Sequence, residues 1–143
     1  MNNILLSSKS VEWETPQYIY DLLNLKYNFT LDPCATINNH KCEKFYTISE
    51  NGLMMSWKGE RVFCNPPYGR KLIDWICKGY NEYFFNNVFS VFLVPARVDT
   101  KWFHRYVLGK ANIYFFNKRL RFNDSKQNCT FPYTTSIHGN VQF

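Results

Sequence analysis

The sequence predicts an α/β fold in which a mostly parallel central sheet carries helices on its faces. Segments with the periodicity of strands and of helices alternate along the chain, which is the pattern of such folds. The run from residue 88 to 94 is almost entirely β-branched or aromatic and ends at Pro95, which is typical of a central strand buried on both faces. At 143 residues the chain has the length of one domain, so we expect a single domain over residues 1–143.

Two amphipathic helices are expected from apolar side chains that recur at helical spacing. Thr15 as N-cap and Pro16 in the first turn predict a helix over residues 16–26. A four-residue apolar repeat predicts a second helix over residues 70–86. The supporting apolar residues are Ile19, Leu22, Leu23 and Tyr27 in the first helix, and Leu72, Ile76, Tyr80 and Phe84 in the second.

The remaining segments are predicted to form a third helix, short strands, loops and an N-terminal arm. Asp99 or Thr100 can cap the third helix, whose apolar residues are Trp102, Phe103, Tyr106 and Val107. Residues 1–12 are expected to form a flexible arm, and residues 33–59 an irregular stretch with several turn signals. Strands are expected at residues 28–31, 61–64, 88–94, 113–116 and 120–122, and the last eight residues are a further candidate.

Composition excludes several classes of protein. Hydrophobic residues make up 45% of the chain and aromatic residues 19%, so we expect a packed core and not a disordered chain. No apolar run has the length of a membrane span, and the N-terminus lacks the features of a signal peptide. We therefore expect a cytoplasmic protein with no membrane partner. The five cysteines have no regular spacing, which argues against a disulfide framework.

Three residues of metal-binding types lie close together in the sequence. Cys34, His40 and Cys42 supply only three ligands, and neither Cys64 nor Cys129 completes a spacing known for structural zinc. Small buried or surface thiols are the commoner use of such cysteines. We therefore predict no bound metal.

The positive charge is concentrated in the last third of the chain. Seventeen Lys and Arg residues against eleven Asp and Glu give a net charge of +6. Residues 1–94 are neutral overall, so the whole excess lies in residues 95–143. Such a basic region is a candidate contact surface for the phosphates of a nucleic acid. The alternative is a solvated surface that is rich in cations and binds nothing.

The tetrapeptide Asn65-Pro66-Pro67-Tyr68 follows a short apolar run and precedes a helical pattern. The two prolines fix their own φ angles and restrict the residue before each, so the loop is expected to be stiff. The Asn65 side-chain oxygen and the Pro66 carbonyl are then two acceptors that can hold one amine. This arrangement suits a planar base gripped by its exocyclic amino group. The alternative is a simple Pro-Pro turn that closes a strand.

Three expected loops follow predicted strands directly, at residues 32–35, 65–68 and 95–97. In a parallel sheet the carboxyl ends of neighbouring strands meet at one edge, and ligands bind beyond that edge. We therefore expect the three loops to line one site.

The ordered set of motifs resembles the phage-type DNA N6-adenine methyltransferases from about residue 12 to residue 132. Single motifs such as Pro95-Ala96-Arg97 would be weak, but their shared order makes the resemblance specific. The matching elements are Trp13-Glu14-Thr15-Pro16, Leu31-Asp32-Pro33-Cys34-Ala35-Thr36, Asn39-His40-Lys41-Cys42, Phe45-Tyr46-Thr47, Asn51-Gly52-Leu53, Trp57, the segment 59–68 and the segment 94–103.

The resemblance implies S-adenosyl-L-methionine as methyl donor, a Rossmann-like class I methyltransferase sheet, and adenine in double-stranded DNA as acceptor. It also implies action in the cytoplasm of a host cell of a phage or prophage. The implied residues are Asp32, Pro33, Cys34 and Ala35 at the methionine end of the donor, with Trp13, Thr15 and Pro16 closing over it, and Asn65, Pro66, Pro67 and Tyr68 at the target base.

Two segments depart from the family pattern. Where family members often have Asp-Asp-Gly-Leu, this chain has Glu50-Asn51-Gly52-Leu53, so Glu50 is the candidate acid for the donor ribose. The tail at residues 133–143 lacks the apolar final strand that usually follows Phe131-Pro132, and we expect an altered or shortened end.

A paired adenine cannot reach such a pocket, so base flipping is expected, with Tyr68 either stacking on the flipped ring or packing beneath the loop as a core aromatic. No metal or general-base histidine is needed for this transfer. Alternatives are a methyltransferase for RNA bases or protein amides, and a nucleic-acid-binding protein that has lost catalysis. The expected phosphate contacts are Arg97, Lys101, Arg105, Lys118, Arg119 and Arg121.

Overall fold

The computed structural model describes residues 14–116 and the strand at residues 133–138. Its helices are α2 (Gln17–Tyr27), α3 (Leu72–Asn86) and the short π-helix η1 (Phe103–Val107). Its strands are β1 (Leu31–Asp32), β2 (Lys44–Phe45), β3 (Arg61–Cys64), β4 (Phe89–Pro95), β5 (Asn112–Phe115) and β6 (Tyr133–His138). The predicted arm at residues 1–12 and the predicted strand at 120–122 lie outside the described residues.

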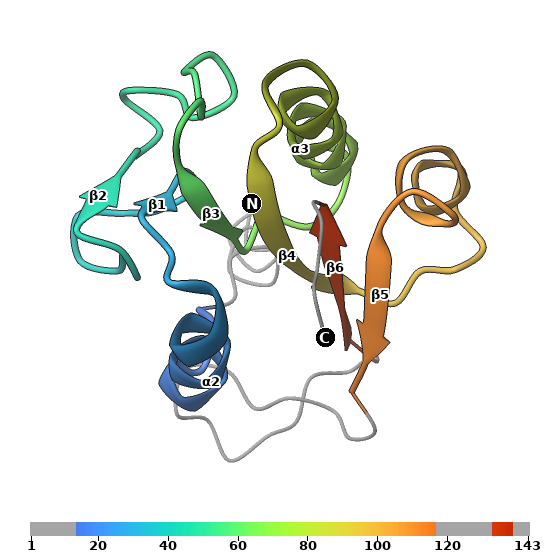
Figure 1. The fold of residues 1–143 in the computed structure, drawn as a ribbon, viewed down its shortest axis with the longest axis horizontal. Helices are drawn as coiled ribbons and strands as arrows, with labels where there is room; N and C mark the ends of the chain where they lie inside the picture. The colour runs from blue at the N-terminus through green and yellow to red at the C-terminus, as the bar shows by residue number, and fades with distance from the viewer. Residues whose placement is uncertain (1–13, 117–132, 139–143) are drawn as a thin grey trace, which may run out of the picture.

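The strands form one sheet in the order β2-β1-β3-β4-β6-β5 (Figure 1). The neighbours from β2 to β4 are parallel, whereas β6 runs antiparallel to both β4 and β5. The prediction of a mixed α/β fold with a largely parallel sheet is therefore confirmed. The short strand β2 was not predicted, because its two residues lie inside the irregular stretch and carry no alternating pattern.

A strand lies in the tail, and it overlaps the candidate strand in the last eight residues at residues 136–138. Residues 133–138 form β6, which is inserted between β4 and β5 and pairs with β4 from Ser90↔His138 to Pro95↔Tyr133. Tyr133-Thr134-Thr135-Ser136-Ile137-His138 is rich in β-branched residues but not in apolar ones. A strand with paired backbone on both sides gains its hydrogen bonds from its neighbours, so a continuous apolar run is not required.

Side chains of β3 and β4 alternate between two core layers, one on each face of the sheet. Phe63, Val91 and Leu93 pack with α2, whereas Val62 and Phe92 pack with α3 and η1. Figure 1 shows α2 and α3 on opposite faces of the sheet. Since every residue from Ser90 to Pro95 is buried, the prediction of a central strand covered on both faces is confirmed.

The helix over residues 16–26 forms one residue later than predicted, at Gln17–Tyr27. Thr15 does not cap it, because the helix starts after Pro16 and no side chain caps that end. Thr15 is buried instead, with 4% of its surface exposed. Asn28 follows the helix as its C-cap. It adopts a left-handed φ of 52°, and its N–H donates to the Asn24 carbonyl.

The third predicted helix is present as a different type. The Thr100 hydroxyl accepts a hydrogen bond from the Phe103 N–H at 3.4 Å, which supports Thr100 as the cap. The turns that follow form the π-helix η1 instead of an extended α-helix. Phe103 and Val107 still face the core, as the apolar pattern predicts.

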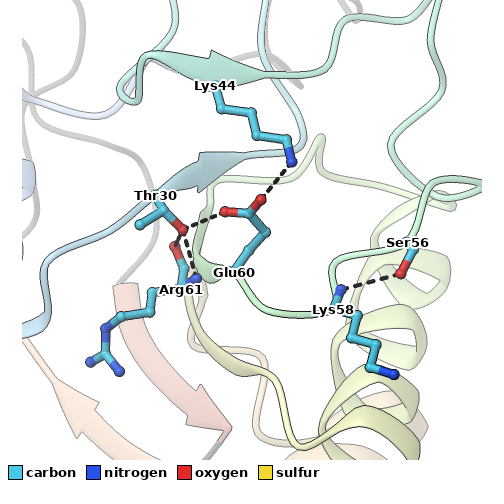
Figure 2. Close-up of polar contacts among 6 residues, drawn as sticks. All are labelled: Thr30, Lys44, Ser56, Lys58, Glu60 and Arg61. Carbon is cyan, nitrogen blue, oxygen red and sulfur yellow. Dashed lines mark hydrogen bonds and ion pairs between the residues drawn. The ribbon is translucent and has the colours of Figure 1, made fainter.

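At the amino ends of the strands, a small polar network ties β1, β2 and β3 together (Figure 2). The Thr30 hydroxyl donates to Glu60 at 2.6 Å and accepts the Arg61 N–H at 2.8 Å. Lys44 at the start of β2 pairs with the other Glu60 oxygen at 2.5 Å. This network lies at the edge opposite the loops that follow the strands.

Candidate active site

Three loops leave the same edge of the sheet after β1, β3 and β4. The parallel register pairs Leu31 with Val62 and Cys64 with Phe92. The segments that begin at Pro33, Asn65 and Ala96 therefore all start from the carboxyl ends of neighbouring strands, where open α/β sheets bind ligands. The structure brings together the loops that sequence reasoning selected.

Asp32 ends β1 and is buried, with 5% of its surface exposed. One carboxylate oxygen accepts the Lys41 N–H at 2.9 Å and the other the Cys34 N–H at 3.4 Å. Burial raises the pKa of Asp32 to about 6, and these two backbone hydrogen bonds oppose the rise only in part. The nearby Lys41 and His40 side chains also favour the ionised form, but less strongly than burial opposes it, so a cationic ligand group would complement the carboxylate.

Backbone hydrogen bonds shape the rest of this loop. The Ala35 N–H bonds the Tyr46 carbonyl at 2.9 Å, and the Tyr46 N–H bonds the Asp32 carbonyl at 3.0 Å. Pro33 and Ala35 are buried, and Cys34 is half-buried against the core layer beneath α3. The loop is therefore held by both β2 and the core, and it is not a free surface turn.

The start of α2 lies against the same loop. Lys41 donates from its side chain to Gln17 Oε1 at 2.8 Å, which joins the first residue of α2 to the segment after β1. The preceding Thr15 is buried, and Pro16 is half-buried with its carbonyl bonded to the first turn of the helix. These positions are compatible with closure over a ligand held by the loop at residues 32–35. Trp13, the other residue expected here, lies outside the described residues.

Glu50 lies in an exposed turn after β2. Its carboxylate accepts both the N–H and the hydroxyl of Thr47, and these hydrogen bonds lower the pKa of Glu50. The next residue, Asn51, has a left-handed φ of 57° and directs the chain back toward Pro33. The carboxylate is thus ionised, exposed and positioned by its own turn.

The Asn65–Tyr68 segment follows β3, as predicted. Pro66 and Tyr68 are buried, and Asn65 and Pro67 are half-buried. The Tyr68 hydroxyl donates to Asn65 Oδ1 at 3.4 Å, so the two side chains converge. Among the described residues, no backbone hydrogen bond uses the Pro66 carbonyl.

The Tyr68 ring packs beneath this loop in the core layer with α2, and 8% of the residue is exposed. From the sequence, Tyr68 could either stack on a flipped base or pack beneath the loop as a core aromatic. The structure shows it in the core. A base could stack on the ring only after the side chains that bury it moved away.

The basic segment is partly described. Arg97, in the loop that leaves the carboxyl end of β4, is exposed, and so are Lys101, just before η1, and Arg105 within η1. The Thr100 hydroxyl donates to the Arg97 carbonyl at 2.7 Å, and the His104 ring contacts the Val98 carbonyl at 2.7 Å. This loop is therefore well ordered by its own contacts. Lys118, Arg119 and Arg121 lie outside the described residues.

The cysteines and the histidine near β1 serve packing contacts. The Cys42 thiol lies 3.5 Å from the buried Tyr20 hydroxyl, and burial raises the pKa of the Cys42 thiol to about 11. The His40 ring stacks on Phe45 at 3.9 Å between centroids and contacts the Cys42 carbonyl. Within residues 14–116 and 133–138, no three potential metal ligands gather at one point.

Comparison with known proteins is consistent with this geometry. A model of the DNA N-6-adenine-methyltransferase (Dam) family matches residues 3–138. This chain belongs to that family. A curated relative, the DNA N-6-adenine-methyltransferase of Escherichia phage T1, is 37% identical over 93 residues, which cover 64% of this chain and 38% of the relative. The chain thus spans well under half the length of that relative. In the described part of this Dam-family chain, no helix is long and apolar enough to cross a membrane.

Sequence reasoning missed two features of this Dam-family site. The Lys41 backbone N–H holds Asp32, and no side-chain pattern can reveal a backbone donor nine residues away. Gly52 approaches the Pro33 carbonyl so closely that a methyl group on it would lie 2.0 Å from that oxygen. The Asn51-Gly52 pair was recognised only as a turn signal, although a glycine in a turn can equally mark a close backbone approach.

Proposed function

We propose that this protein transfers a methyl group from S-adenosyl-L-methionine to the N6 amine of a flipped-out adenine in double-stranded DNA. We further propose that its sheet is of the Rossmann-like class I methyltransferase type. One observation carries the proposal: the buried Asp32 turn and the Asn65–Tyr68 turn leave the adjacent strands β1 and β3 at one edge of the sheet. Membership of the Dam family supports the choice of donor and acceptor.

The residues after β1 fit a donor that carries an ammonium group. Asp32 is buried with two neutral hydrogen-bond donors, and each carboxylate oxygen keeps a second acceptor position for a cation. Glu50, which is exposed and whose pKa is lowered by its Thr47 hydrogen bonds, would accept from the hydroxyls of a ribose. Cys34 and Ala35 would line the methionine end, and Thr15 and Pro16 would cover it. The sulfonium of S-adenosylmethionine supplies an electrophilic methyl group.

The residues after β3 would prepare the nucleophile. Asn65 Oδ1 and the Pro66 carbonyl can each accept one hydrogen of the adenine amine, with Pro67 keeping the turn stiff. Accepting both hydrogens favours the pyramidal amine, whose lone pair then attacks the methyl carbon as the carbon–sulfur bond breaks. The nitrogen becomes positively charged and loses one proton to water. Acceptors aimed at the developing positive charge stabilise the transition state more than the ground state.

The exposed cations would hold the DNA backbone. Arg97 follows the strand next to the one that carries the base-binding loop, Lys101 and Arg105 are exposed further along the chain, and phosphate contacts of this kind would fix position without reading sequence. A flipped adenine must reach Asn65, whose Oδ1 lies 3.4 Å from the Tyr68 hydroxyl. Because Tyr68 is buried, stacking of the base on its ring would require the side chains that cover it to move.

The Asn65→Ala variant tests the proposed role of the loop. We expect it to bind S-adenosylmethionine as the unchanged protein does and to lose about 10²–10³-fold in methyl transfer to duplex DNA, the usual effect of removing one group that stabilises the transition state. Donor affinity is measured by calorimetry and transfer by mass spectrometry of N6-methyladenine. Asn81→Ala, on the exposed side of α3, is the matched control. Undiminished transfer by the Asn65 variant would show that the loop does not hold the amine.

The same assays separate the alternative functions. Labelled methyl groups found in RNA bases or in protein amides, and not in DNA adenine, would reject DNA as the acceptor. A protein that binds duplex DNA but gives neither heat nor a thermal shift with S-adenosylmethionine would be a binding protein without catalysis.

A further inference from the structure

The turn that carries Glu50 and the loop that begins at Asp32 touch through Gly52. A methyl group at Gly52 would lie 2.0 Å from the Pro33 carbonyl oxygen and 3.1 Å from the Trp75 ring, so only glycine allows this approach. Both Gly52 and Pro33 are buried, which means that water does not separate the two segments. The contact lies between the two parts of the site that the proposed function assigns to opposite ends of the donor.

Trp57 holds the other side of Gly52. Its ring is fully buried, and its Nε1–H donates to the Gly52 carbonyl at 3.0 Å. A buried carbonyl without this donor would lose a hydrogen bond that water could not replace. The indole therefore fixes the position of Gly52, and a side chain without an N–H at that place could not.

Helix α3 supports the Trp57 ring. Trp75 stacks on it with ring centroids 6.4 Å apart and planes inclined by 22°. Lys78 lies over the same ring at 5.4 Å and is itself held by Glu82 through an ion pair of 2.6 Å. Two tryptophans and one glycine therefore connect α3 to the Pro33 carbonyl, and all three are buried.

We propose that Gly52 and Trp57 are positioning residues that hold the Glu50 turn and the Asp32–Ala35 loop at a fixed separation. The inference rests on the proposed donor site. A ligand with one end in each loop gains affinity from two contacts only if their spacing is set before it binds. A ligand that reaches one loop alone does not sense that spacing.

Two ligands distinguish this role from a merely structural one. S-adenosylhomocysteine has both the amino-acid end and the nucleoside end, whereas adenosine has the nucleoside end alone. For Gly52→Ala we expect binding of S-adenosylhomocysteine to weaken at least tenfold, with adenosine affinity unchanged within about twofold. For Trp57→Phe, which keeps the ring and removes the N–H, we expect a weakening of about 2- to 10-fold, the effect of one hydrogen bond. Calorimetry with each ligand gives both affinities.

Gly109→Ala is the matched control, because Gly109 has a φ of 75° that alanine adopts only with strain, while no described atom lies within 4 Å of the added methyl group. This variant should lose stability and keep the affinity for S-adenosylhomocysteine. Equal losses for both ligands in the Trp57 or Gly52 variant, or no loss for either, would overturn the positioning role. An unchanged protein that binds neither ligand would instead reject the proposed donor site itself, and with it this inference.

Discussion

At the scale of single residues, Asp32 combines a functional position with a cost in stability. Its carboxylate is buried, and burial raises its pKa from 3.8 to about 6 although the nearby Lys41 and His40 charges oppose the rise. Folding therefore shifts the carboxyl toward its protonated form, whereas an ammonium ligand would favour the ionised form. Such a conflict is characteristic of binding sites, where a side chain is placed for its ligand and not for the stability of the empty fold.

The first prediction concerns the pH dependence of stability. A raised carboxyl pKa contributes stability that is fully present below the unfolded value and is lost as the pH rises through the folded value. Between pH 4 and 7 we expect the free energy of unfolding of the unchanged protein to fall by about 2–3 kcal/mol relative to Asp32→Asn. Urea unfolding at several pH values measures this difference. Parallel pH profiles for the two proteins would contradict it.

Donor affinity should have the opposite pH dependence. The ionised Asp32 carboxylate is the form that attracts an ammonium group, so we expect affinity for S-adenosylmethionine to rise between pH 5 and 7 as the carboxyl loses its proton. Asp32→Asn should bind the donor weakly at every pH in this range. Calorimetric titrations across the range provide the test, and an affinity that falls toward pH 7 would exclude the proposed role of Asp32.

A further residue-scale prediction concerns Ser90 in the middle of β4. Its hydroxyl is fully buried and has no hydrogen-bond partner in the described part of the chain. Ser90→Ala removes this unsatisfied group, so we expect the free energy of unfolding to increase by about 1 kcal/mol. Ser56→Ala, in an exposed turn, is the control and should not stabilise the protein. A destabilised Ser90 variant would show that the hydroxyl is satisfied.

At the scale of secondary-structure elements, the polar network at the amino ends of β1, β2 and β3 sets how these short strands align. β1 and β2 have two residues each, so their ladders provide few hydrogen bonds. Glu60 bridges Thr30 beside β1 and Lys44 of β2, and Figure 2 shows Lys58 directed away from this bridge. Partial burial opposes ionisation of Glu60, but the hydrogen bonds from Lys44 and Thr30 outweigh it and lower its pKa.

The Thr30→Val variant tests this network. Valine keeps the β-branched shape and removes both the bond to Glu60 and the bond from the Arg61 N–H, so we expect a loss of about 1 kcal/mol in stability at pH 7. Glu60, whose pKa is lowered, contributes to stability only while it is ionised. The difference in stability between the two proteins should therefore shrink as the pH falls below the ordinary pKa of a glutamate. Thermal unfolding at pH 7 and pH 3.5 measures both effects. Lys58→Ala should change neither the stability at pH 7 nor the stability at pH 3.5.

At the scale of the whole molecule, a cation of the basic region stands at the edge of the sheet that carries the loops. The net charge of +6 arises in the last third of the chain, and Arg97 is exposed in the loop that leaves the carboxyl end of β4. The polar network and the end of α2 occupy the opposite edge. A polyanion would therefore approach the edge that carries Asn65, and the proposed phosphate contacts would orient it there.

The salt dependence of DNA binding tests this arrangement. Each phosphate contact that is removed should reduce the slope of log affinity against log salt by about 0.9. We expect Arg97→Ala with Lys101→Ala to weaken binding to duplexes of any sequence and to reduce the slope by about 2. Lys26→Ala, at the far end of α2, should leave the slope unchanged. An unchanged slope in the double variant would show that this edge is not the DNA-binding face.

The sequence by itself determined the alternation of strands and helices, the buried central strand and the three loops that share one edge. These features depend on local periodicity and on chain order. The apolar run at residues 88–94 shows its burial in its own composition. The order of the motifs, which follows the chain, was likewise sufficient to indicate the family.

Only the tertiary structure decided which residues meet. It placed Tyr68 in a core layer, inserted β6 antiparallel between β4 and β5, and set Gly52 against Pro33. It also raised the pKa of Asp32, because burial depends on what covers a side chain. Each of these outcomes depends on contacts between segments that lie far apart in the chain, and the local pattern of neither segment specifies its partner.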